Sequence, residues 1–240
     1  MSTFLSAFAG LVERLAELLQ PLFHASAAAA AIVLFTALVR LLVHPLSRAS
    51  ARGQQARAQL QPKIVELRRK HARNPERLNK AVLELHAEEK ISPLSGCLPS
   101  LLQMPAFFLL YHLFSSTSIG GESNGLLAHT LFAAPLGDRW TDALGHGGLF
   151  GTAGLVYLGL FALVAAVATF TYRRTKRMTA ATPVPAGDGE QMPGLGAVTK
   201  VMPFFSFFTL ITVAVVPLAA ALYVVTSTTW SAVERAVLYR

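Results

Sequence analysis

Charged residues are scarce in this 240-residue sequence. They make up 14% of the chain, whereas hydrophobic residues make up 53% and the mean hydropathy is +0.47. Soluble domains of this size carry about 25% charged residues. The chain therefore has more apolar surface than a soluble core could bury, which predicts an all-α protein that crosses a membrane several times.

Cysteine is almost absent as well. Cys97 stands alone, which excludes an internal disulfide and any metal site built from several cysteines. The seven histidines form no H-E-x-x-H pair, and neither a G-x-S-x-G motif nor a glycine-rich phosphate loop occurs. We therefore expect a protein that is not an enzyme and that uses no metal and no other cofactor.

The N-terminal segment has an amphipathic pattern. Leucine and phenylalanine recur at helical spacing, while Glu13, Arg14 and Glu17 lie towards the other side. This pattern predicts a helix over residues 1–24 that lies on the extracytoplasmic surface of the membrane and ends near Pro21. A cleaved signal peptide is the alternative, but it would begin with basic residues, and the first charge here is acidic.

Apolar segments predict a core of five transmembrane helices, at residues 26–47, 94–116, 149–171, 201–215 and 217–234. The last two share one apolar stretch with Pro217 near its middle, which could instead form a single kinked span. Eleven Lys and Arg residues separate the first two spans, whereas the connection at 117–148 has only Arg139. Basic loops stay in the cytoplasm, so we expect the N-terminus outside and residues 172–200 and 235–240 inside.

Residues 48–92 are polar but have a helical pattern. Asn74 suits a helix N-cap and Pro75 the first helical position. Folding the chain back at Asn74 brings Leu67 opposite Leu78, which predicts a short antiparallel coiled coil in the cytoplasm. Its basic residues suit docking of a ribosome, anionic lipids or a partner protein. These residues are Arg68, Arg69, Lys70, Arg73 and Arg77. The alternative is that the hairpin is only a solvated spacer.

Arg40 lies well inside the first predicted span. A charge at the centre of a membrane helix costs about 2.5–3.5 kcal/mol, and the apolar segments as far as Trp230 contain no Asp, Glu or Lys. Arg40 either extends to the headgroups or faces a hydrated cavity, where its unopposed charge would attract an acidic guest. Each polar residue of the other spans, taken singly, suits a hydrogen bond between helices. Together they could line such a cavity: Gln103, Ser206, Thr209, Thr212, Thr226 and Ser227.

Three stretches carry a resemblance to a known family. They are TALVRLLVHPLS, ISPLSGCLPSLLQMPAFFLLYHLF and VMPFFSFFTL, in this order and with the basic hairpin after the first. Over about residues 26–235 the chain resembles the YidC/Oxa/Alb membrane protein insertases, in their compact Gram-positive form. The resemblance implies a five-helix core with a hydrophilic groove that is open to the cytoplasm and to lipid. It also implies that Arg40 and Gln103 line this groove.

The same resemblance implies how the protein acts and where. Guests are nascent membrane proteins, the location is the bacterial plasma membrane, and candidate partners are the ribosome and a Sec-type channel, with no nucleic acid bound except through the ribosome. Guest helices would leave along the second and fourth spans, past Met104, Phe107, Phe108, Met202 and Phe205. Two features depart from the family pattern, because no N-terminal cysteine is present and the tail after Trp230 is short.

Two other functions agree with the same residues. A small transporter or channel for an anionic solute would use Arg40 as its selectivity charge, although the apolar segments offer no carboxylate for ion coupling. A structural assembly factor would use only the hairpin, to dock partner proteins.

Overall fold

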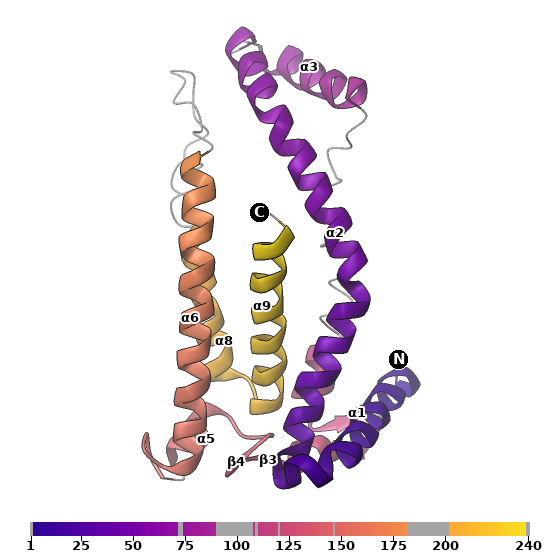
Figure 1. Ribbon diagram of the computed structural model, residues 1–240, viewed down its shortest axis with the longest axis vertical. Coiled ribbons are helices and arrows are strands. Elements are labelled where there is room, and N and C mark those ends of the chain that lie inside the picture. Colours follow the sequence, from indigo (N-terminus) through magenta and orange to yellow (C-terminus); the bar gives the residue numbers. More distant parts are fainter. Residues whose placement is uncertain are drawn as a thin grey trace.

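The computed structural model describes residues 2–71, 74–89, 108, 110–119, 121–145, 147–181 and 202–238. Figure 1 shows α2, α6 and α9 running along the long axis of the molecule, with α8 behind α6. The helix α1 and the β strands gather at the end where these three helices begin, and α3 lies at the other end. We call the first of these the ladder end.

The structure is mostly helical, as predicted. Its main helices are α1 (Ser2–Phe23), α2 (Ala27–Lys70), α3 (Pro75–Glu88), α5 (Trp140–Gly145), α6 (Thr152–Ala181), α8 (Phe208–Val215) and α9 (Leu218–Leu238). Short 3-10 turns are η1 (His24–Ser26), η2 (Gly125–Ala128) and η3 (Met202–Phe207). Two antiparallel ladders, which the sequence did not indicate, pair β1 (Ser118–Ile119) with β2 (Glu122–Ser123) and β3 (Thr130–Leu131) with β4 (Ala134–Pro135).

The helix α2 joins two predicted elements into one. It has 44 residues and continues through Pro45 and Pro62, so the first predicted span and the first arm of the predicted coiled coil form a single rod. At 1.5 Å per residue this rod is about 66 Å long. A hydrocarbon core is about 30 Å thick, so a membrane around its first half would leave the second half in water.

The turn between α2 and α3 forms where the sequence predicted it. The Asn74 side chain accepts a hydrogen bond from the Arg77 amide at 3.0 Å, and Pro75 begins α3. The predicted coiled-coil register is not followed, because Lys63 pairs with Glu89, about two turns beyond its expected neighbour. Figure 1 shows α3 inclined to α2 rather than lying along it. The hydrogen bond to Glu89 and its charge raise the pKa of Lys63.

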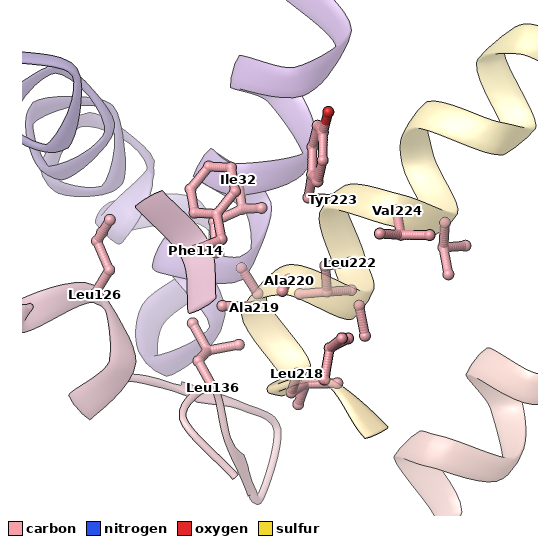
Figure 2. Close-up of a cluster of buried hydrophobic side chains, with 14 of the residues drawn as sticks. Ile32, Phe114, Leu126, Leu136, Leu218, Ala219, Ala220, Leu222, Tyr223 and Val224 are labelled. Carbon is pink, nitrogen blue, oxygen red and sulfur yellow. The ribbon is translucent and has the colours of Figure 1, made fainter. Parts of the chain in front are cut away.

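A packed apolar core closes the ladder end of the bundle. Figure 2 shows Ile32 of α2, Phe114 and Leu136 converging on the first turns of α9. Every residue of α9 from Leu218 to Val225 is buried. Three consecutive alanines there allow neighbouring backbones to approach closely.

The connection at 117–148 also binds the start of α9 through its backbone. The amides of Leu218 and Ala219 donate to the carbonyls of Asp138 and Leu136, each at 2.9 Å. These bonds satisfy amides that the first turn of a helix leaves without partners. The Tyr157 hydroxyl donates to the same Asp138 carbonyl at 2.6 Å, which ties α6 to the junction.

We predict that Asn124→Ala destabilises this end of the molecule by about 1–3 kcal/mol. The buried Asn124 amide donates to the carbonyls of Leu113 (2.8 Å) and Ser116 (3.0 Å), which would lose these partners. Thermal unfolding of the purified protein in detergent measures the change. Exposed Ser123→Ala is the matched control, and an equal loss in both variants would contradict this role for Asn124.

Two helices in the described parts of the chain are long and apolar enough to cross a membrane. They lie within Ser6–Lys70 and Thr152–Arg177. The apolar helix at Phe204–Val215 is shorter, and α9 is long enough but has five hydroxyl residues between Thr226 and Ser231. The second predicted span, at 94–116, lies largely outside the described residues.

Candidate functional site

The character of α9 changes abruptly at Thr226. The eight residues before it are apolar or aromatic and all are buried. The next six, Thr226–Ser231, read TSTTWS, so five of six carry a hydroxyl group. Polar groups are therefore concentrated beyond the packed ladder end, in the middle of the bundle, where an apolar environment would make isolated hydroxyls unfavourable.

Arg40 points from α2 to this hydroxyl segment. Its Nε donates to the Ser227 Oγ at 3.0 Å, and its Nη2 donates to the same oxygen. Arg40 lies 13 residues beyond Ala27, which corresponds to about 20 Å along α2. The half-buried guanidinium thus binds a neighbouring helix and does not extend away from the bundle.

A second polar contact joins the same two helices one turn further along α2. His44 Nδ1 and Glu234 Oε1 are 2.5 Å apart, and the Glu234 side chain is only 9% exposed. Beyond them, Gln55 Nε2 donates to the Leu238 carbonyl at 3.2 Å. We call these three contacts the polar seam: Arg40–Ser227, His44–Glu234 and Gln55–Leu238.

Glu234 changes the expected electrostatics of Arg40. The sequence predicted an unopposed positive charge, because the apolar segments as far as Trp230 contain no acidic residue. That prediction overlooked Glu234, just beyond this segment, whose carboxylate interacts electrostatically with the Arg40 guanidinium; Arg235 acts on Arg40 in the opposite sense, and Arg40 forms no ion pair among the described side chains. The signal was present in the spacing, since Arg40 and His44 are four residues apart and Ser227 and Glu234 are seven apart, so each pair shares a helix face.

The remaining predicted groove residues separate into different places around α9. Thr226 lines a cavity of about 560 Å³ between α2, α6 and α9, together with His44 and Glu234. In the same lining, the buried Thr229 hydroxyl has no hydrogen-bond partner among the residues that the structure describes. Ser206 and Thr209 line another cavity, of about 240 Å³, between α6, η3, α8 and α9.

Thr212 is not among the residues that line either cavity. The Thr212 hydroxyl donates to the Phe208 carbonyl of its own helix at 3.3 Å. Gln103 lies outside the described residues. The structure therefore brings Arg40 and Ser227 into direct contact. Thr226 lies at one cavity beside α9, and Ser206 and Thr209 lie at the other.

The predicted exit surface contains exposed aromatic side chains. Phe205 and Phe108 are 66% and 59% exposed. Met202 begins η3, but its side chain, like Met104 and Phe107, lies outside the described residues. Along η3 and α8 the exposed positions form a continuous apolar row that the sequence prediction missed, although its spacing of four and three was visible: Phe204, Phe208, Ile211 and Val215.

The predicted docking residues gather near the turn at Asn74. Arg68, Arg69 and Lys70 occupy the exposed last turn of α2, and Arg77 is exposed in α3. Arg73 lies outside the described residues. Basic residues in the last turn also stabilise a helix through its dipole, which is their ordinary structural role.

No metal-ion site is found within the described ranges, because no three His, Cys, Asp or Glu side chains gather there. The polar seam and two cavities, each with hydroxyl groups in its lining, are therefore the chemically distinctive features of this part of the chain. Such features can bind and position a polar guest.

Comparison with known proteins gives a consistent result. Residues 19–240 match the family described as 60Kd inner membrane protein. A relative from Clostridium perfringens is 42% identical over 93 residues, which are 38% of this chain and 39% of the relative. A relative from an Anaeromyxobacter species is 43% identical over 81 residues (34% and 15%), and one from Polynucleobacter necessarius is 39% identical over 101 (42% and 18%).

Each of these three relatives is named membrane protein insertase YidC. The aligned part spans well under half of the length of each of them.

Proposed function

This chain belongs to the 60Kd inner membrane protein family, and from this membership and its polar seam we propose that it is a membrane protein insertase. The matched relatives are named as insertases rather than as enzymes. The family name and the bacterial relatives locate the chain in the bacterial plasma membrane. Its guests would be nascent membrane proteins.

The observation that carries the proposal is the change in α9 from a packed apolar half to a hydroxyl-rich half beside Arg40. An insertion groove needs this asymmetry, because it must admit polar peptide from one side while the other side stays closed to ions. We propose that the ladder end is extracytoplasmic and the hydroxyl-rich end is open to the cytoplasm. The high positive charge of residues 48–92 supports this orientation.

The guest itself supplies the energy in this mechanism. Each buried CH₂ group contributes about 0.8 kcal/mol, so a guest helix of about 20 apolar residues enters lipid spontaneously. The barrier is the transfer of the polar flank of the guest through hydrocarbon. A groove that reaches Arg40, about 20 Å along α2 from Ala27, shortens that transfer.

Arg40 is proposed to hold acidic guest tails for a short time. A guanidinium binds a carboxylate through two parallel hydrogen bonds, which are stronger than its bonds to a hydroxyl. A guest carboxylate could therefore replace Ser227, the present partner of Arg40. Glu234, which interacts electrostatically with Arg40, would weaken this attraction and so slow the capture of an acidic tail.

The exit route is proposed along α8. Its exposed row of Phe204, Phe208, Ile211 and Val215 gives a guest helix an apolar surface against which it can slide into lipid. Together, η3 and α8 are about 24 Å long. A fourth span of this length is short for a hydrocarbon core of about 30 Å, which implies a thinner bilayer at this exit.

We keep the five-span topology and the docking role of the hairpin within this proposal. The spans would be 26–47, 94–116, 149–171, 201–215 and 217–234, with the N-terminus outside and the C-terminus in the cytoplasm. The exposed basic tip at Arg68, Arg69, Lys70 and Arg77 suits a ribosome or anionic lipids. A Sec-type channel is a further candidate partner.

Crosslinking tests the proposal directly. A photoreactive amino acid at Ser227 should crosslink to a ribosome-stalled membrane nascent chain, because Ser227 lies beside Arg40 in the proposed groove. The same probe at Leu18, which is 76% exposed on α1, should not. Crosslinking of a stalled soluble chain to the same extent would count against a groove for membrane proteins.

The second candidate, a channel or transporter for an anionic solute, requires a path that opens at both ends. The buried run Leu218–Val225 argues against such a path. A flux assay in liposomes without a nascent chain separates the two functions, because an insertase should leave solute flux unchanged.

We predict that Glu234→Gln speeds insertion of guests with acidic tails several-fold. The substitution removes the anion that interacts with Arg40 but retains a hydrogen-bonding side chain beside His44. The rate of tail translocation in reconstituted vesicles measures the effect. Guests with neutral tails are the control, and an equal acceleration of both guests would contradict an electrostatic role.

A further inference from the structure

The cavity between α6, η3, α8 and α9 has a lining unlike that of a packed helix interface. Its volume is about 240 Å³, and no carboxylate is found among its described lining residues. Its floor is apolar and includes Val164, Val167 and Ala168. Five hydroxyl groups and one guanidinium make up the polar part: Thr171, Ser206, Thr209, Thr228, Ser231 and Arg235.

Three of these hydroxyl groups are available as donors. Thr228 donates to the Val224 carbonyl at 2.8 Å, and Ser231 donates to the Ser227 carbonyl at 2.9 Å. The hydroxyls of Thr171, Ser206 and Thr209 have no hydrogen-bond partner in the part of the chain that the structure describes. A ligand with acceptor oxygens would satisfy all three.

Among the described side chains, no carboxylate lines this cavity to oppose the charge of Arg235. Arg235 forms no ion pair among the described side chains, and the neighbouring Glu234 contacts His44 at the α2 side of α9. Arg174 Nη2 donates to the Arg235 carbonyl at 2.8 Å, so the guanidinium of Arg174 lies next to this turn of α9. Guanidinium groups with adjacent hydroxyls are suited to phosphate or carboxylate oxygens.

The depth of the cavity indicates which anion it meets. Thr171 lies 19 residues beyond Thr152, or about 29 Å along α6, and Arg235 lies 17 residues beyond Leu218, or about 26 Å along α9. A hydrocarbon core is about 30 Å thick. With the ladder end at one membrane surface, these residues reach the headgroups of the opposite leaflet, where phosphate belongs to phospholipid.

We propose that this cavity binds the headgroup of an anionic phospholipid from the cytoplasmic leaflet. The phosphate would bind to the Arg235 guanidinium, and a headgroup with further hydroxyls would bond to Ser206 and Thr209. A cavity of about 240 Å³ suits a small headgroup and is too small for a guest helix. The apolar lining residues Val164 and Val167 would contact the start of the acyl chains.

Lipid binding to the purified full-length chain tests this proposal. Native mass spectrometry in detergent should detect one retained phosphatidylglycerol per chain and no retained phosphatidylcholine. Arg235→Gln should weaken phosphatidylglycerol binding about tenfold, since it removes one charge-assisted contact. The matched control is Arg177→Gln, which removes the same charge from an exposed position on α6 and should change binding less than twofold.

Further variants and ligands ensure that each result either supports or overturns the lipid site. Should Arg235→Gln fail to fold, the double variant Ser206→Ala/Thr209→Ala takes its place and should also weaken binding. Equal binding of phosphatidylcholine, or an equal loss in Arg177→Gln, overturns the site. Equal competition by inorganic phosphate would mean a site for free anions and would also overturn it. No nascent chain is used, so a failure here is separate from a failure of the insertase proposal.

Discussion

Arg40→Ala should slow the insertion of guests with acidic translocated tails roughly tenfold to a hundredfold. Hydrogen bonds to charged groups contribute about 1.5–3 kcal/mol, and each 1.4 kcal/mol corresponds to about a factor of ten. The side chain is half-buried and its present partner is the neutral Ser227 hydroxyl, so it can exchange that partner for a guest carboxylate. Protease protection of the tail in reconstituted vesicles gives the rate.

Two controls separate charge from packing at this position. Arg40→Lys retains the charge but loses the two-pronged geometry, so it should give an intermediate rate. A guest whose acidic tail residues are replaced by glutamine should insert at the same rate into vesicles with wild type or Arg40→Ala. Equal rates for the two proteins on the acidic guest would reject the proposed role of Arg40, even if insertion itself is confirmed.

Phe114→Ala should lower the free energy of unfolding by about 3–5 kcal/mol, the usual cost of removing a fully buried aromatic side chain. Phe114 is completely buried, and its ring centroid lies 5.9 Å from that of Tyr223 on α9. Figure 2 shows it within the cluster that closes the ladder end. Denaturant unfolding of the purified protein measures the loss.

The control for Phe114 is Phe150→Ala, because Phe150 is 82% exposed. Exposed substitutions usually change stability by about 0.5 kcal/mol or less. In vesicles, Phe114→Ala should also increase the leak of small ions, since this core is the proposed seal. A folded but equally tight variant would contradict the sealing role while leaving the packing argument intact.

The sequence predicted those helix boundaries that are set by residues a few positions away. The turn before α3 follows from Asn74 and Pro75, because the N-cap bond to the Arg77 amide spans only three residues. The break before α9 follows from Pro217, which precedes its first residue. The continuity of α2 through Pro45 and Pro62 was not predicted, since a proline removes one backbone bond locally and the surrounding helix decides whether it continues.

The polar seam could be predicted only in part. Arg40 was identified because a charge in an apolar segment is costly wherever that segment packs. His44 and Glu234 were not, because their contact joins positions 190 residues apart and depends on the rotation of α2 against α9. The same holds for Ser206 and Thr209, whose cavity lies on a different face of α9 from Arg40.

The sequence alone determined that this is a membrane protein, which segments are helical, and where polar groups enter apolar helices, because hydropathy and capping act over a few residues. Only the tertiary structure decided which polar groups meet. Glu234 interacts electrostatically with Arg40, the hydroxyl residues Ser206 and Thr209 line one cavity with Arg235, and α3 is inclined to α2. Helix rotation and crossing are set by the packing of side chains that are distant in the chain.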